Sequence, residues 1–216
     1  LPARISLAAA FRLDLRAHRT FAWLVASRFL FLLGTYAVGR FFLYFIADRL
    51  GLDPAQAAGE AGGLLAGLTL VTVLAALPAG WAADRWGRLP LMLAGAAVSA
   101  LGTLGLIVAG GAGQILLFGG LMAVGSAAFA GANWALTADV APPAEAARFF
   151  GLANVGTAGA AAAAGLFGPL IDSANAAAPG LGYTVLFAGA TLAFVLSGAV
   201  LGFARPAARP SVIFGE

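Results

Sequence analysis

The chain has 216 residues, of which 62% are apolar and only 10% are charged, whereas a soluble domain has roughly 45–50% apolar and about 25% charged residues. So little polar surface argues against a soluble enzyme, a disordered chain and a nucleic-acid-binding protein, although the net charge is +3. There is no cysteine and one histidine, His18, so thiolate or His-rich metal sites and Ser–His pairs lack their residues. We expect no metal, no cofactor and no catalytic residue.

Six apolar runs are long enough to cross a bilayer, whose hydrocarbon core is about 30 Å thick and needs roughly 20 helical residues. They cover residues 21–47, 61–81, 89–109, 114–138, 149–171 and 181–204. Glycine is frequent in these runs, yet lipid favours helix because each backbone group must bond within its own segment. The sequence therefore predicts an all-α membrane protein with a six-helix domain over 20–204, a leading segment at 1–19 and a tail at 205–216.

Small residues predict how these helices pack. Pairs of small residues four apart let two membrane helices approach closely, and they occur at Gly62/Ala66, Gly156/Ala160 and Gly159/Ala163. Gly165, Gly168 and Pro169 predict a bend in the fifth helix. The connections are short, with residues 48–60 expected as the first of them.

Arginine, the only basic residue type besides histidine, predicts the orientation. If the first helix enters from the cytoplasm, that side carries nine arginines, and the opposite side carries only Arg49. Because arginine concentrates in cytoplasmic loops, we expect both termini in the cytoplasm of a multi-pass protein of a bacterial inner membrane. The nine are Arg4, Arg12, Arg16, Arg19, Arg85, Arg88, Arg148, Arg205 and Arg209.

The turn between the second and third helices has the most specific pattern, Gly80-Trp-Ala-Ala-Asp84-Arg85-Trp-Gly87-Arg88. It resembles the signature loop of the major facilitator superfamily, G-x-x-x-D-R-x-G-R, although Leu and Pro follow where that family has a further basic residue. A tight turn suits Gly87, and Asp84 suits the positive end of a helix. The alternative is a generic basic turn that only obeys the charge rule.

A second segment, from Trp134 to Asn154, resembles the link between the fourth and fifth helices of a facilitator half. Its acidic, Pro, acidic and Arg positions are Asp139, Pro143, Glu145 and Arg148. Residues 14–29 resemble the stretch where a facilitator's central linker enters its seventh helix, so 1–19 corresponds to that linker. The resemblance covers nearly the whole chain and identifies it with a carboxy-terminal six-helix half, helices seven to twelve.

The resemblance implies a secondary transporter that moves a small solute by alternating access, with the site between two six-helix halves. The partners it implies are the lipid bilayer and either another half or a second copy of this chain. In the family the first and fourth helices of a half line the cavity, the second and fifth face the other half, and the third and sixth face lipid. The cavity helices here are then 21–47 and 114–138.

Tyr36, Arg40 and Tyr44 lie four residues apart on one face of the first helix, and two phenols with a guanidinium suit hydroxylated or anionic solutes. An arginine at mid-membrane costs about 2.5–3.5 kcal/mol on insertion scales. The alternative is that Arg40 extends to the outer headgroups.

Two further cavity candidates, Asn133 and Trp134, end the fourth helix. Asn133 either binds solute or forms a helix–helix hydrogen bond. Arg28 either forms a gate ion pair, with Asp139 as the candidate partner, or extends to the cytoplasmic headgroups.

The alternatives to a carrier are a membrane-embedded enzyme and a truncated or non-transporting six-helix scaffold. An enzyme needs clustered acids or a nucleophile with a base at membrane depth, whereas Asp48, Asp84 and Asp172 fall at helix ends. The prediction is therefore not an enzyme, and the substrate, the coupling ion and the direction of transport stay open.

Overall fold

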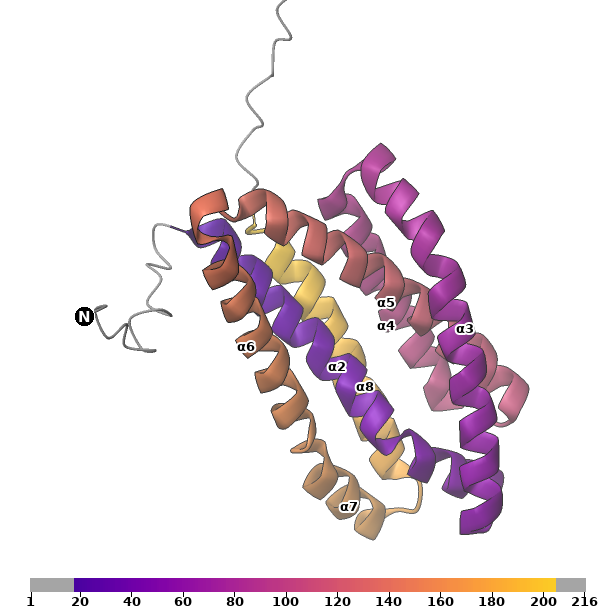
Figure 1. Ribbon diagram of the computed structural model, residues 1–216. Coiled ribbons are helices and arrows are strands. Elements are labelled where there is room, and N and C mark those ends of the chain that lie inside the picture. The colour runs from indigo at the N-terminus through magenta and orange to yellow at the C-terminus, as the bar shows by residue number, and fades with distance from the viewer. Residues whose placement is uncertain (1–17, 205–216) are drawn as a thin grey trace, which may run out of the picture.

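The computed structural model describes residues 18–204, and the expectations for 1–17 and 205–216 lie outside these residues. All regular structure in the described part is helical (Figure 1). The helices are α2 (Arg19–Leu50), α3 (Pro54–Trp86), α4 (Arg88–Val108), α5 (Ala112–Val140), α6 (Ala146–Ala164), α7 (Phe167–Ala177) and α8 (Leu181–Leu201), with a short 3-10 helix at Pro143–Glu145.

Six segments are long and apolar enough to cross a membrane. Five are single helices, and the sixth is the segment Pro143–Ala177, which contains both α6 and α7. The fold class predicted from the sequence, an all-α protein with six apolar spans, is confirmed.

The first connection is much shorter than the predicted 48–60. Helix α2 continues to Leu50 and ends on Gly51, which has a φ of 64°. The Asp53 carboxylate accepts hydrogen bonds from the backbone N–H groups of Ala55 and Gln56, at 2.9 and 3.0 Å. Because an N-cap aspartate followed by proline favours a helix start, α3 begins at Pro54, ahead of its apolar run.

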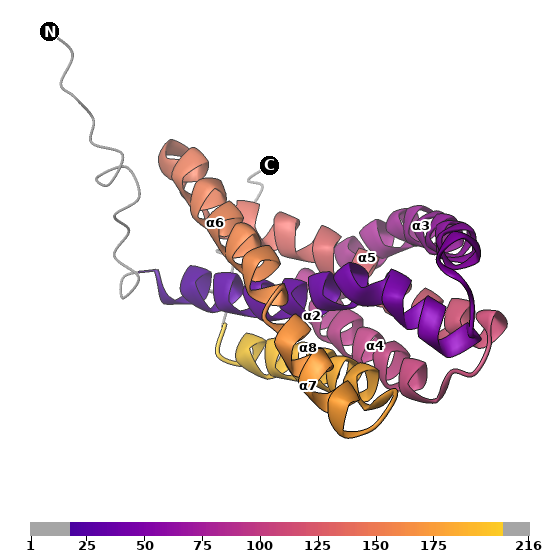
Figure 2. The ribbon, with the colours of Figure 1, turned by 90° about the horizontal axis from the view of Figure 1, so that it is seen from below.

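Helices α2 and α5 form the middle of the bundle. Helix α2 packs against α6 and α8, and α5 packs against α3 and α4. Viewed from below, α3 and α6 lie on one side of α2 and α5, and α4 and α8 lie on the other (Figure 2). The core between them is aromatic, because the Phe31 ring stacks on Phe129 at 3.8 Å and lies 4.8 Å from Phe194. This arrangement leaves one face of α2 and α5 flanked by α3 and α6.

Glycine lets α4 and α5 meet backbone to backbone. A Cβ atom on Gly125 would lie 2.4 Å from the Ser99 Oγ and 2.5 Å from the Gly95 carbonyl oxygen, and one on Gly102 would lie 2.6 Å from the Met122 nitrogen. A Cβ atom on Gly95 would likewise lie 2.7 Å from the Gly125 carbonyl oxygen. Since Cβ atoms do not approach other atoms so closely, these three positions require glycine. The small-residue pairs predicted from the sequence do not include this contact.

The predicted small-residue pairs pack unevenly. A Cβ on Gly156 would lie 3.1 Å from Val25, and one on Gly159 would lie 3.5 Å from Phe29, so both pairs in α6 face α2. Gly62 has nothing within 4 Å among the described residues. Both members of the pair in α3 are exposed in this part of the chain.

The predicted bend in the fifth span is confirmed as a break. Helix α6 ends at Ala164 and α7 begins at Phe167. Across the break the backbone N–H groups of Gly165 and Leu166 bond to carbonyls three residues back, at 3.1 and 3.0 Å. Glycine at 165 and 168 and proline at 169 weaken the regular helix here.

Replacing Gly125 with alanine should destabilise the bundle by about 1–3 kcal/mol, because the added methyl group has no room between α4 and α5. The measurement is thermal unfolding in detergent. Gly120→Ala is the matched control, since it lies on the same helix with nothing within 4 Å of its Cβ position. Equal stability of the two variants would contradict the close contact.

Candidate functional site

Three helices meet around a buried arginine. Arg28 of α2 is 7% exposed. Its Nη1 donates to the Asn133 Oδ1 of α5 at 2.7 Å, and its Nε donates to the Thr157 Oγ1 of α6 at 3.0 Å. The guanidinium carbon lies 3.8 Å from the centre of the Trp134 ring. We call these four residues the Arg28 site.

The neighbours of the Arg28 site hold its side chains in place. The Trp134 ring, which lies under the Arg28 guanidinium, also stacks on Phe150 of α6, with the ring centres 5.6 Å apart. Asn133 is fully buried, and its Oδ1 faces Arg28 because the opposite amide orientation would set donor against donor. The Asn133 Nδ2 is consequently left without a hydrogen-bond partner among the described residues.

Arg28 lies within the apolar part of α2. The helix has 32 residues and is therefore about 48 Å long, so the Arg28 Cα lies roughly 14 Å from its start. A hydrocarbon core of about 30 Å centred on α2 includes this depth. In the structure the Arg28 head group is bound sideways to α5 and α6, which differs from the alternative in which it extends along α2 toward the cytoplasmic headgroups.

The expected ion pair between Arg28 and Asp139 is absent from the described structure. Asp139 pairs with Arg88, at the start of α4. It lies six residues beyond Asn133 on α5, about 9 Å farther along the helix. Asn133 and Thr157 occupy the guanidinium of Arg28, so Arg28 is not part of that pair.

Arg40 lies on the same helix as Arg28, about 18 Å along its axis. It is exposed, and its guanidinium carbon lies 3.8 Å from the Cβ position of Gly165, at the break between α6 and α7. Side chains on a helix lean toward its N-terminus, so Arg40 leans toward the middle of the span. There it lies beside the C-terminal, negative end of α6.

The two tyrosine candidates on this helix differ in exposure. Tyr44 is 62% exposed, and Tyr36 is half-buried against the core. The structure therefore brings Asn133 and Trp134 together with Arg28, whereas Tyr36, Arg40 and Tyr44 are related by their spacing of four residues along α2.

The signature turn is held to the end of α5. Helix α3 ends at Trp86, Gly87 has a φ of 95° that only glycine adopts readily, and Arg88 begins α4. Besides the ion pair with Asp139, Arg88 donates to the carbonyl oxygen of Ala135 at 2.5 Å. One side chain thus ties the turn to a backbone carbonyl and a carboxylate in the last two turns of α5.

The other loop candidates lie near the surface. Asp84 and Gly80 are exposed, and the exposed Arg85 lies 5.4 Å from the centre of the Trp81 ring. Arg148 pairs with Glu145 at 3.2 Å, one turn away.

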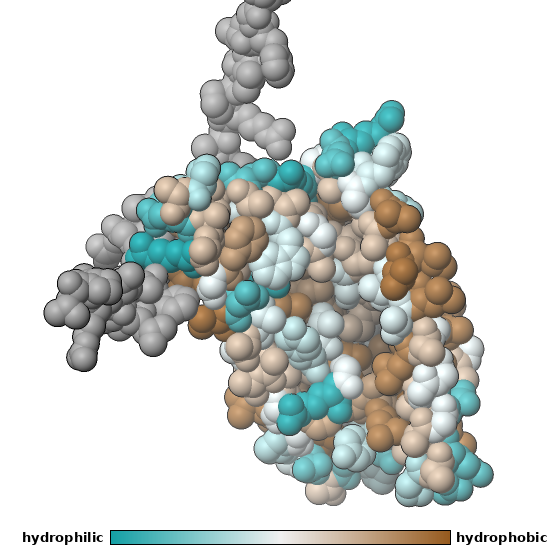
Figure 3. Space-filling view, viewed as in Figure 1, coloured by the Kyte–Doolittle hydropathy of each residue, from teal (hydrophilic) through white to brown (hydrophobic). Residues whose placement is uncertain are grey.

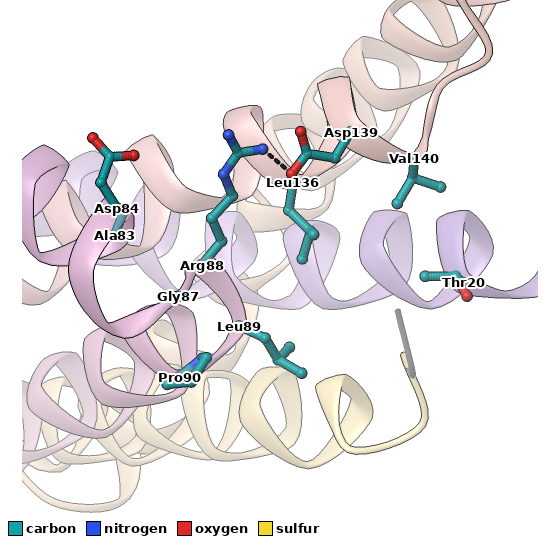
Figure 4. Close-up of a pocket in the computed structure, with 10 residues that line it drawn as sticks. All are labelled: Thr20, Ala83, Asp84, Gly87, Arg88, Leu89, Pro90, Leu136, Asp139 and Val140. Atoms are coloured by element: carbon teal, nitrogen blue, oxygen red, sulfur yellow. Dashed lines mark ion pairs between the residues drawn. The ribbon is translucent and has the colours of Figure 1, made fainter. Parts of the chain in front are cut away.

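A pocket of about 910 Å³ opens beside the turn, at the end of α5 (Figure 4). Its walls come from α2, from the turn and from α5. Arg88 points across it to Asp139, while Asp84 lies on the other side of Arg88 (Figure 4). The lining residues are Thr20, Ala83, Asp84, Gly87, Arg88, Leu89, Pro90, Leu136, Asp139 and Val140.

Six long apolar helices with few charges between their ends define an α-helical multi-pass membrane protein. Residues 16–214 match the family described as Major Facilitator Superfamily. The chain belongs to this family and has the six helices of one half of such a transporter. No curated protein shows a significant match to the chain.

Thr157 is the member of the Arg28 site that the sequence did not reveal. A threonine in a membrane helix commonly bonds back to its own helix, as the Thr157 hydroxyl does to the Ala153 carbonyl at 3.2 Å. Its additional role as an acceptor for Arg28 depends on the packing of α6 against α2, which its local sequence does not encode.

Arg88→Gln and Asp139→Asn should each weaken the attachment of the turn and lower the free energy of unfolding. The double variant should lose less of this free energy than the sum of the two single losses. We expect a coupling of about 0.5–1 kcal/mol, because both side chains are partly exposed. Thermal unfolding of all four forms measures it. The same cycle on the exposed pair Arg148 and Glu145 should show less coupling, and a reversed order would contradict the assignment.

Proposed function

We propose that the chain is one half of a secondary carrier that moves a small solute by alternating access and works with a second six-helix half. The observation that carries this proposal is how unevenly the spans are buried. In the most apolar stretch of each span, the buried share is 11% for α3 and 22% for Pro143–Ala177, whereas it is 39–56% for the other four spans. These are the second and fifth spans, which face the other half in this family.

The exposed side of α3 is apolar. Leu77 is 85% exposed, and Leu74, Val73 and Leu70 are 64, 61 and 58% exposed. Figure 3 shows hydrophobic side chains gathered over α3, with paler and hydrophilic side chains across the middle of the same face. A second half placed against α3 and α6 would cover the apolar edges and enclose the polar middle.

In this proposal α2 and α5 line the solute cavity. The groups that would face the solute are Tyr36, Arg40 and Tyr44 on α2 and Asn133 and Trp134 on α5. The turn and the links around it, with Arg88 and Asp139 as the central pair, would act as the gate at the basic end. We propose that this half is the carboxy-terminal one.

The charge distribution supports an orientation with both termini in the cytoplasm of a bacterial inner membrane. Arg88 of the turn is paired with Asp139, at the end of α5, and His18, before the first turn of α2, contacts Phe149, beside Arg148, at 5.1 Å. Arg49 lies at the other end of α2 and donates to the carbonyls of Ala109 and Ile107. Basic groups therefore gather at one end of the bundle, as expected for a cytoplasmic side.

Single cysteines test the cavity, because the chain has none of its own. Tyr36→Cys and Arg40→Cys should react with a water-soluble maleimide in intact membranes, since both would face the aqueous cavity. Leu101→Cys is the control, because Leu101 is 64% exposed on α4 but would face lipid. Equal labelling at all three positions, or none at 36 and 40, would overturn the cavity assignment.

A photo-crosslinking amino acid at Leu77 tests the second half. We expect a protein adduct in membranes, with either another copy of the chain or a second six-helix protein, because this face of α3 is unburied. The same amino acid at Leu101 should crosslink to no protein. A chain that gives no adduct at either position would favour the alternative, a scaffold that stands alone.

A further inference from the structure

We propose that the Arg28 site binds an anionic group of the transported solute, a carboxylate or a phosphate. This inference rests on the proposed carrier function and specifies the chemical class of its substrate. It is carried by a buried cation whose ligands are all neutral.

The charge of Arg28 is not balanced within the described residues. Its hydrogen-bond partners, Asn133 and Thr157, and the ring below it, Trp134, carry no charge. Among residues 18–204, the acids lie at helix ends or in the first two turns of a helix, and the ion pairs formed are those of Arg88 and Arg148. A cation held at membrane depth without a counter-ion is costly and marks a functional site.

The site also has a surplus of donors. A guanidinium carries five N–H donors, and the bonds to Asn133 and Thr157 use two of them. The Asn133 Oδ1 accepts the hydrogen bond from Arg28, and the buried Asn133 Nδ2 has no hydrogen-bond partner in the described structure. The group that complements this arrangement must accept hydrogen bonds and carry negative charge, as carboxylate and phosphate oxygens do.

The aromatic groups fix how such a group would approach. Trp134 covers one face of the guanidinium at 3.8 Å, and the Trp134 ring also stacks on Phe150. With a face covered, the guanidinium is left to bind oxygen atoms through its edge, where its fork matches two oxygens of one anion. A neutral hydroxylated solute would satisfy the donors but leave the charge unbalanced.

Arg40 adds a second positive charge on the same helix. It has no ion pair among the described residues, and its guanidinium lies at the break between α6 and α7. From Arg28 to Arg40 helix α2 contains no acidic residue. The field along this stretch of α2 therefore favours anions over cations.

The competing occupant is a carboxylate from the second half, which would neutralise Arg28 permanently. The test measures thermal unfolding of the full chain in a neutral detergent with sodium acetate, sodium succinate or sodium phosphate. Sodium chloride at the same ionic strength and glucose are the controls. At least one of the three anions should raise the unfolding temperature, by about 5 °C once it is near a hundredfold over its dissociation constant.

The three probes also separate the sources of the anionic group. A response to acetate and succinate assigns a carboxylate, and a response to phosphate alone assigns a phosphate. No response to any of the three, or an equal response to chloride or glucose, overturns the proposal.

Arg28→Gln should abolish the response, and Arg19→Gln should retain it, because Arg19 is exposed at the start of α2. Asn133→Asp is the stronger variant, since it places a carboxylate at 2.7 Å from the Arg28 Nη1. It should unfold at a higher temperature than the parent without any anion and should no longer respond to one. An Asn133→Asp variant that unfolds earlier or still responds would overturn the proposal even if Arg28→Gln does not fold.

This outcome is separable from that of the carrier proposal. If the anions have no effect while Tyr36→Cys still reacts from water, the chain remains a carrier half and its solute is not an anion. If anions bind through Arg28 while positions 36 and 40 are sealed from water, the site binds an anion in a protein that does not transport it.

Discussion

The constraint on which the whole structure depends is that lipid, and not water, surrounds the helices. Lipid offers no hydrogen bonds, so each span must satisfy its own backbone, and it offers no hydrophobic reward for helix association, so close packing takes that role. The backbone contact of α4 with α5 at Gly95, Gly102 and Gly125 is one result. Another is that large apolar side chains such as Leu77 point outward, as few soluble proteins would allow.

Under the same constraint, the polar groups inside the bundle determine which helices are joined by side-chain hydrogen bonds. Arg28, Asn133 and Thr157 join α2, α5 and α6 through side chains, and a buried Ser27–Ser197 hydrogen bond of 2.9 Å joins α2 to α8. Helix α2 is thus connected by polar bonds to three of its neighbours. Because Arg28 bonds to both α5 and α6, replacing it would remove a hydrogen bond from each of these helices.

The sequence predicted most of the fold because length and hydropathy decide whether a segment crosses a membrane. It also singled out Arg28, Asn133 and Trp134, whose side chains meet in the structure, and their role in binding a solute stays a prediction. It placed the start of α3 too late, because Ala-rich residues after Asp53 are helical without being strongly apolar. It paired Arg28 with Asp139 and missed Thr157, because side-chain partners depend on how far each helix is shifted along its neighbour, which hydropathy does not encode.

The break at Gly165 divides the fifth span between two neighbours. Helix α6 packs on α2, whereas α7 packs on α8, and the Asn175 side chain accepts a hydrogen bond from the Gly182 N–H at 2.8 Å, which anchors α7 to α8. The basic-end part of this span is therefore held by α2 and the far part by α8, and the break between Ala164 and Phe167 separates the two attachments.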